Sequence, residues 1–267
     1  MTIFQSIVLG VVEGLTEFLP ISSTAHMKFI NPLLGVNATD PFNEMFEVVI
    51  QLAAILAIVL LYYKKFFDLK RISFYGKLVV GVIPALIVGA LLGHYIKNAL
   101  GNLYFISSVM IGGGVLLLFV EKFFKKPIVE KEQQITLKNA FVVGCFQVLS
   151  IVFPGLSRSA ATIVGGLQQR FTRSVAAEFS FFLAVPTMLA ASVKSLWDTH
   201  KQNPEVFNTN NLSTLAIGSV VSFIIALIAV KVFIGFVKKY GFPVWGIYRI
   251  IVGSIMLALL LTKTISN

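Results

Sequence analysis

Ionisable and hydroxyl side chains are concentrated in residues 13–26, which read EGLTEFLPISSTAH. Glu13 and Glu17 are four residues apart, so a helix would carry both carboxylates on one face. Pro20 predicts the end of that helix. The polar residues after this break are Ser22, Ser23, Thr24 and His26. Apolar sequence flanks the segment, and ionisable groups in such surroundings usually mark chemistry or transport. We therefore expect a buried polar site.

A second cluster lies at residues 154–160, which read PGLSRSA. The guanidinium of Arg158 is a planar fork of donors that matches phosphate oxygens and stays charged when desolvated. Ser157 and Ser159 flank it, and a helix beginning here would add backbone donors that hold anions. The alternative is a helix cap with the arginine reaching to the lipid surface. We favour the anion site, because a matching pair of hairpins would bring the two clusters together.

Two glutamates beside a phosphate-binding arginine indicate a divalent cation. Mg²⁺ favours one or two carboxylates plus phosphate oxygens, and Ca²⁺ also takes oxygen ligands. The alternative is that Glu13 and Glu17 are buried, hydrogen-bonded and largely protonated. Burial alone does not explain two acids on one helix face next to a run of hydroxyls. We therefore favour Glu13 and Glu17 as ligands of Mg²⁺ or Ca²⁺.

His26 and Ser23 are the candidates for bond-making chemistry in the first cluster. An imidazole can act as acid, base or nucleophile near neutral pH, although a single histidine is more often a satisfied polar group. Because His26 follows three hydroxyl residues, we favour a role for it. Ser23 is the best nucleophile among the hydroxyls, since an internal duplication aligns it with Ser157. The residues alone do not decide which group attacks.

The composition indicates an integral membrane protein. Hydrophobic residues make up 57% of the 267 residues and charged residues 13%, against roughly 45–50% and 25% in soluble domains. The formal net charge is +10. Most basic residues lie in short turns between apolar segments, which is the pattern of cytoplasmic loops rather than of a nucleic-acid-binding surface. We expect no nucleic-acid partner.

The apolar segments predict an all-α fold with about six transmembrane helices. Segments of spanning length lie near residues 43–63, 76–97, 103–121, 175–197, 212–237 and 243–262. Residues 3–34 and 138–168 differ, because each carries two short apolar stretches separated by a proline and a hydroxyl cluster. Such broken pairs point to re-entrant helical hairpins that meet inside the membrane.

The two halves of the chain resemble each other. Gly10 precedes Pro20 by ten residues, and Gly144 precedes Pro154 by the same distance. We predict a single membrane domain, residues 1–267, with repeat one at 1–121, a cytoplasmic connector at 122–137 and repeat two at 138–267. Three spanning helices per repeat make the second repeat inverted, and the basic turns place both termini outside.

The sequence resembles the undecaprenyl-diphosphate phosphatase family of bacterial membranes. The resemblance rests on EGLTEFLPISSTAH and PGLSRSA, together with FEVVIQL at 46–52, EFSFFLAVP at 178–186 and IYRIIVG at 247–253. It covers essentially the whole chain. Two small departures are Ala25 and Ala160, which stand where a glycine is common in the family. Neither departure changes an ionisable group.

The resemblance implies a metal-dependent hydrolase that converts undecaprenyl diphosphate into undecaprenyl phosphate and inorganic phosphate. This recycles a lipid carrier for peptidoglycan and other envelope polymers, and it is associated with bacitracin resistance. It also implies a multi-pass protein of the bacterial inner membrane, with its site open to the periplasm or outer face. The implied acidic pair is Glu13 and Glu17. The implied hydroxyl-imidazole group is Ser22, Ser23, Thr24 and His26, and the phosphate clamp is Ser157, Arg158 and Ser159.

A catalytic scheme follows from these parts. Glu17, Ser23, His26 and Arg158 would be catalytic, with Arg158 supplying the charge stabilisation. Two other classes of function stay open at this point. Inverted repeats with broken helices also build secondary transporters, so the chain could carry a polyprenyl phosphate across the membrane. A lipid-phosphate-binding protein would not need the acidic pair. The oligomeric state is open, with a homodimer as the candidate assembly.

Overall fold

The computed structural model describes residues 1–37, 39–124 and 126–265. Its longer helices, in chain order, are α1 (Ile3–Thr16), α2 (Ser23–Leu33), α3 (Pro41–Leu61), α4 (Tyr63–Phe66), α5 (Ile72–Leu91), α6 (Gly93–Leu100), α7 (Leu103–Phe123), α8 (Leu137–Val152), α9 (Arg158–Gln168), α10 (Arg173–Gln202), α11 (Thr209–Tyr240) and α12 (Pro243–Leu261). Two short 3₁₀ helices lie at Glu132–Gln134 and Pro204–Val206. The expected all-α fold is confirmed.

Six of the described helices are long and apolar enough to cross a membrane, namely α3, α5, α7, α10, α11 and α12. Each overlaps one of the six segments expected from the sequence, although the segment expected at 76–97 is divided between α5, which ends at Leu91, and α6, which begins at Gly93. The helices α10 and α11 are longer than expected, with 30 and 32 residues, whereas about 20 suffice to span a bilayer. The polar end of α10 contains no proline after Pro186, and the next proline, Pro204, follows the end of the helix at Gln202.

The expected hairpins are also present. They consist of α1 with α2 and of α8 with α9, and each of these helices has 11 to 16 residues. In both hairpins a serine with positive φ caps the returning helix: Ser22 with φ 70° and Ser157 with φ 75°. Each hydroxyl accepts a hydrogen bond from the backbone N–H three residues later, at 3.3 Å. The same strained cap therefore occurs at both turns.

This shared cap changes how the two hairpins correspond. Matching the prolines pairs Ser23 with Ser157, but matching the caps pairs Ser22 with Ser157 and Ser23 with Arg158. The difference arises because the second turn has one more residue between its proline and its cap than the first. The alignment argument that singled out Ser23 as nucleophile is therefore wrong, although Ser23 keeps other support.

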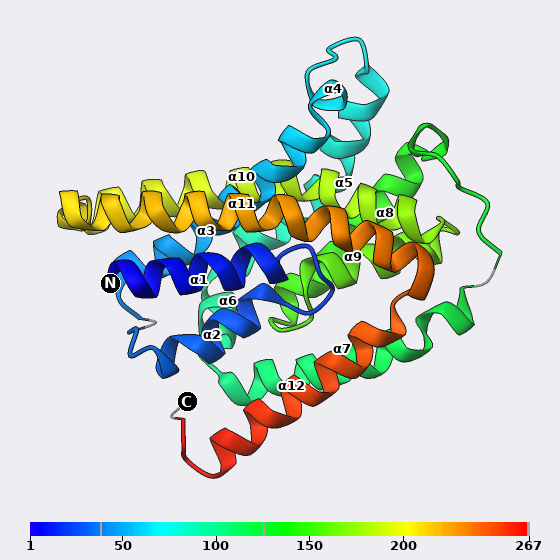
Figure 1. Cartoon of the computed structure of the whole chain (residues 1–267). Coiled ribbons are helices and arrows are strands. Elements are labelled where there is room, and N and C mark those ends of the chain that lie inside the picture. The colour runs from blue at the N-terminus through cyan, green and yellow to red at the C-terminus, as the bar shows by residue number, and fades with distance from the viewer. Residues whose placement is uncertain (38, 125, 266–267) are drawn as a thin grey trace.

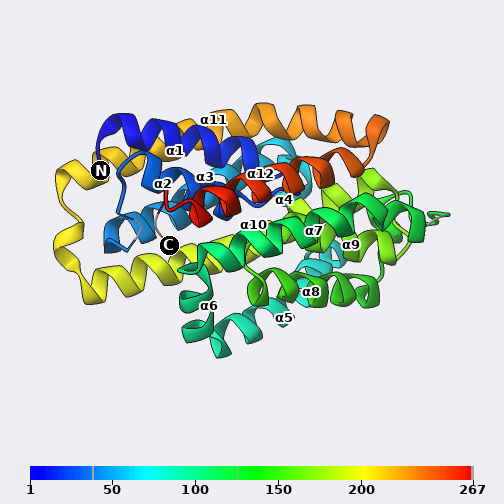
Figure 2. The same ribbon diagram turned by 90° about the horizontal axis from the view of Figure 1, so that it is seen from below.

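The hairpins enter the bundle from opposite sides (Figures 1 and 2). The first reaches the centre from the left of Figure 1 and packs along α11, whereas the second comes from the right and packs along α5. The start of α1 and the end of α12 lie on the same side. Each hairpin thus packs on a helix of the other half, as an inverted repeat requires. The division into residues 1–121, 122–137 and 138–267 stays a prediction.

Glycines let the hairpins approach their partner helices closely. A Cβ atom at Gly14 would lie 2.6 Å from the carbonyl oxygen of Ser222 in α11. A Cβ at Gly144 would lie 2.1 Å from the carbonyl oxygen of Gly81 in α5. Both distances are shorter than any tolerable contact, so backbone packs directly on backbone. This packing fixes the depth to which each hairpin tip reaches.

Candidate active site

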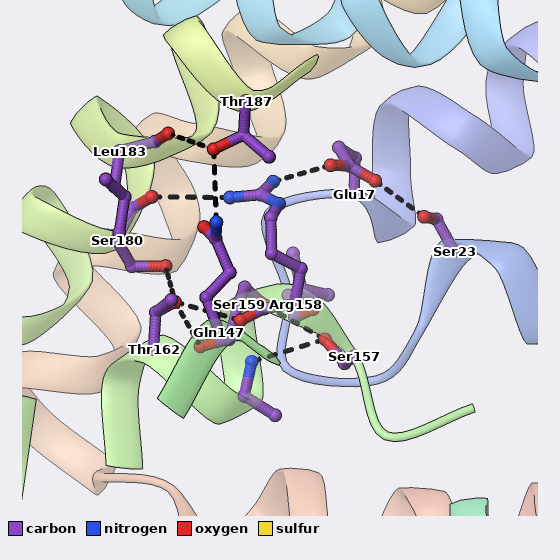
Figure 3. Close-up of polar contacts among 12 residues, drawn as sticks. Glu17, Ser23, Gln147, Ser157, Arg158, Ser159, Thr162, Ser180, Leu183 and Thr187 are labelled. Carbon is purple, nitrogen blue, oxygen red and sulfur yellow. Dashed lines mark hydrogen bonds and ion pairs between the residues drawn. The ribbon is translucent and has the colours of Figure 1, made fainter. Parts of the chain in front are cut away.

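The tips of the two hairpins are in direct contact (Figure 3). Arg158 Nη2, at the start of α9, donates to Glu17 Oε1, just after α1, at 2.6 Å. The hydroxyl of Ser159 donates to the backbone carbonyl of Leu19 at 2.9 Å. The expected meeting of the two clusters is therefore a feature of the structure, across about 140 residues of sequence.

Glu17 is the centre of this contact. Its Oε1 pairs with Arg158, and its Oε2 accepts a hydrogen bond from the hydroxyl of Ser23 at 2.6 Å (Figure 3). Arg158 also donates through Nη1 to the backbone carbonyl of Ser180 at 3.3 Å. Its Nε is buried and has no hydrogen-bond partner among the described residues. The two bonds use two of the five N–H groups of the guanidinium, so the side chain keeps donors for a ligand.

A cavity of about 570 Å³ opens beside the tips. Its polar wall contains Glu17, Ser22, Ser23, Thr24, Gln51, Gln147, Ser150, Ser157, Arg158 and Thr187. Its apolar wall comes from α5, α6 and α10, with Ala85, Leu86, Ala90, Ile96, Leu100 and Met188. The first residues of both α2 and α9 line it, and helix N-termini attract anions. The cavity therefore suits an anionic group attached to an apolar chain.

Glu13 lies behind the cavity. Its side chain is fully buried, and neither carboxylate oxygen receives a hydrogen bond within the described part of the chain. The charged groups that act on it electrostatically are Glu17, Glu47 and Arg158. Bare carboxylate oxygens are the ligands that hard cations prefer. The donor set therefore fits the expected divalent ion.

That ion would need further ligands. The described residues contain no cluster of three or more His, Cys, Asp or Glu side chains with metal-binding spacing. Mg²⁺ in phosphate-handling sites commonly takes one or two carboxylates and completes its shell with water and substrate oxygens. Glu17 in the cavity wall and Glu13 buried outside that wall offer the two carboxylates of this arrangement.

His26 is held away from the cavity wall. Its Nδ1 lies 2.8 Å from the carbonyl oxygen of Ser22, to which it donates. Its Nε2 lies 2.8 Å from the hydroxyl of Tyr248 in α12, and the two rings stack with centroids 5.7 Å apart. His26 is not among the described residues that line the cavity. The catalytic role expected for His26 stays a prediction.

The surroundings of Ser159 differ from those expected for a member of the phosphate clamp. Its hydroxyl is engaged with the carbonyl of Leu19 and lies 3.2 Å from the hydroxyl of Ser157. Ser159 is buried and joins the two tips, whereas Ser157 lines the cavity. The residues Glu17, Ser22, Ser23, Thr24, Ser157 and Arg158 are the expected site residues that the structure brings to the cavity.

Several polar residues near the site were not assigned a role from the sequence. Gln147 donates through Nε2 to the hydroxyl of Thr187 at 3.2 Å, and its Oε1 has no partner among the residues described (Figure 3). The hydroxyls of Thr162 and Ser180 lie 2.6 Å apart, and the hydroxyl of Thr162 also donates to the backbone carbonyl of Arg158 at 2.9 Å (Figure 3). Gln147 precedes Pro154 by seven residues, as Glu13 precedes Pro20, and this spacing is the sequence signal that could have found it.

The fold and site together define a class of protein. The chain is a multi-pass, all-α membrane protein whose two hairpins, entering from opposite sides, meet at a buried ion pair between Arg158 and Glu17. The model of the family described as "Bacitracin resistance protein BacA" matches residues 6–255, and the chain belongs to this family.

Curated relatives cover nearly the whole chain. A protein of Flavobacterium johnsoniae is 47% identical over 258 residues, which is 96% of each chain. Proteins of Porphyromonas gingivalis and Desulfitobacterium hafniense are 44% and 43% identical, and each match covers 98% of both chains. All three relatives carry the name undecaprenyl-diphosphatase.

Proposed function

We propose that this chain hydrolyses undecaprenyl diphosphate to undecaprenyl phosphate and inorganic phosphate, which recycles the lipid carrier for cell-wall synthesis. The observation that carries the proposal is the cavity, in which Arg158 and the N-termini of α2 and α9 face an apolar wall. A diphosphate attached to a long hydrocarbon chain matches both walls, because the diphosphate is anionic and the chain is apolar. The names of the relatives support the same substrate.

Substrate binding would rearrange the contact between the tips. Arg158 is paired with Glu17 at 2.6 Å, and a phosphate is a better partner for the fork than a single carboxylate oxygen. The incoming phosphate would take over Arg158 and release Glu17 Oε1. The hydroxyls of Ser22, Thr24 and Ser157 and the backbone N–H groups of both helix starts would hold the remaining oxygens.

Ser23 is then placed to attack. Its oxygen would form a bond to the terminal phosphorus while the bond from that phosphorus to the bridging oxygen breaks, and undecaprenyl phosphate would leave. The proton of Ser23 would pass to Glu17 Oε2, which already accepts that hydrogen bond. A water would attack the phosphoserine, restore the Ser23 hydroxyl and release inorganic phosphate. Arg158 would stabilise the charge of both transition states.

Glu13 and Glu17 would hold a Mg²⁺ or Ca²⁺ ion. When bound, the ion would neutralise charge on the diphosphate oxygens. The unpaired oxygens of Glu13 support this assignment, because a buried carboxylate without donors needs a cation or a proton.

We place the protein in the bacterial inner membrane with the site open to the outer face. The cavity extends towards α6, and Lys194 of α10 lies at its rim. With the basic turns inside, this is the outer side. In a Cys145→Ser background, a cysteine at Thr2 should label with an impermeant maleimide in intact cells, and one at Asp68 only after permeabilisation. The reverse pattern would overturn the orientation.

Phosphate release from detergent-solubilised protein separates the hydrolase from a lipid carrier. A carrier has no second compartment in detergent and should release nothing. We expect purified wild-type protein to release inorganic phosphate from undecaprenyl diphosphate, EDTA to abolish the release, and added Mg²⁺ or Ca²⁺ to restore it. A preparation that binds the lipid without releasing phosphate would refute the proposal.

A further inference from the structure

Arg249 of α12 is a fully buried cation that the proposed chemistry does not use. Its five N–H groups each donate to a backbone carbonyl. These bonds run from Nε to Met110 at 3.2 Å, from Nη1 to Pro20 at 3.1 Å and Leu156 at 2.7 Å, and from Nη2 to Val109 at 3.4 Å and Gly155 at 2.9 Å. One side chain therefore joins three separate segments of backbone.

Two of these segments are the turns of the hairpins. Pro20 lies in the turn between α1 and α2, and Gly155 and Leu156 lie in the turn between α8 and α9. The third segment, with Val109 and Met110, belongs to α7, which packs along α12. Arg249 thus fixes both turns to one frame made of α7 and α12.

One serine close after the bound carbonyls of each turn has a strained backbone. Ser22 and Ser157 adopt positive φ, which is unfavourable for a residue with a Cβ and persists only where the surroundings impose it. These serines cap the two helices whose first residues line the cavity. The hydrogen bonds from Arg249 act one to two residues before each cap.

We propose that Arg249 is a positioning residue, which holds the two turns in the register that brings Arg158, Glu17 and Ser23 together. The kinetic test of this inference rests on the proposed function, whereas the structural test does not. A side chain without N–H donors would leave the turn carbonyls unsatisfied. Lysine has three donors on one atom and could not serve both turns and α7.

Two neighbouring glycines of α7 offer a matched test. A Cβ at Gly113 would lie 2.4 Å from Arg249 Nη2 and 2.9 Å from a methyl carbon of Leu156. A Cβ at Gly112 would meet no atom within 4 Å among the described residues. Gly113→Ala should therefore displace the guanidinium without removing it. Gly112→Ala adds the same methyl group to the same helix and is the control.

The kinetic test measures kcat and KM of both variants in detergent. We expect Gly113→Ala to lower kcat by about 10- to 100-fold, because small misplacements of reacting groups have effects of this size, with KM within about 3-fold. Gly112→Ala should match the wild type. The double variant with Arg158→Lys should lose less than the product of the two single losses, because both act through the same contact. Unchanged kcat in Gly113→Ala, or losses that multiply in full, would overturn the proposal.

The structural test does not depend on turnover. Leu15 and Leu149 are exposed residues near the ends of α1 and α8, so spin labels there report the separation of the hairpins. In a Cys145→Ser background, Gly113→Ala should shift or broaden the distance distribution, and Gly112→Ala should not. An unchanged distribution would refute the positioning role even if the wild type hydrolyses the lipid. If Gly113→Ala does not fold, Arg249→Lys replaces it in both tests.

Discussion

The Arg158→Lys variant is expected to release phosphate about 10- to 100-fold more slowly than the wild type. Lysine keeps the positive charge but lacks the fork, so it can replace the pairing with Glu17 but cannot also grip two phosphate oxygens. The guanidinium is well supported in its present place, with Nη2 on Glu17 and Nη1 on the carbonyl of Ser180. The loss should therefore appear in turnover rather than in folding.

Arg173→Lys is the matched control for this variant. Arg173 also pairs with a glutamate, with Nε and Nη2 donating to the two oxygens of Glu121 at 2.8 and 2.6 Å. It does not line the described cavity. Initial rates of phosphate release, normalised to folded protein, should stay near the wild-type value in the control. Near-normal rates in Arg158→Lys itself would remove Arg158 from phosphate binding.

Glutamine at position 13 or 17 is expected to abolish most of the metal-stimulated rate. Glutamine keeps the size of the side chain and removes the charge. Glu17→Gln should be the more severe, with a loss of about 100-fold or more, because it removes a ligand and the proton acceptor of Ser23 together. Raised Mg²⁺ or Ca²⁺ should partly rescue Glu13→Gln, since Glu17 would still hold the ion weakly.

Thermal stability separates a metal ligand from a structural acid at position 13. The carboxylate of Glu13 is fully buried without hydrogen-bond donors in the described chain, so a neutral amide there should leave the melting temperature unchanged or higher. Glu178→Gln is the control, because Glu178 pairs with Lys65 and lies outside the cavity wall that the structure describes. Full activity and an unchanged metal response in Glu13→Gln would exclude that carboxyl as a ligand.

The sequence predicted the spanning helices and the hairpins because both depend on local properties. The length of an apolar segment decides whether it can cross a bilayer, and Pro20 and Pro154 interrupt segments that are too short to do so. The meeting of Glu17 with Arg158 followed from the odd number of helices in each half. These inferences needed only spacing, composition and the direction of the chain.

The positions of Arg249 and Tyr248 could not be predicted in this way. Arg249 binds backbone carbonyls up to 229 residues away. Every residue has a backbone carbonyl, so the sequence does not show which of them an arginine binds. Tyr248 meets His26 across 222 residues. The correspondence of Ser22 with Ser157 was also missed, because the two turns differ by one residue and proline spacing does not show where the cap lies.

The fate of the terminal phosphate tests the central claim most directly. Purified protein in detergent would receive undecaprenyl diphosphate with ³²P in its terminal phosphate. We predict that all released label is inorganic phosphate, that undecaprenyl phosphate forms in equal amount, and that an acid-quenched reaction carries transient label on Ser23. Release of the label as pyrophosphate, or intact lipid at the end of the reaction, would contradict hydrolysis at the contact between the two hairpins.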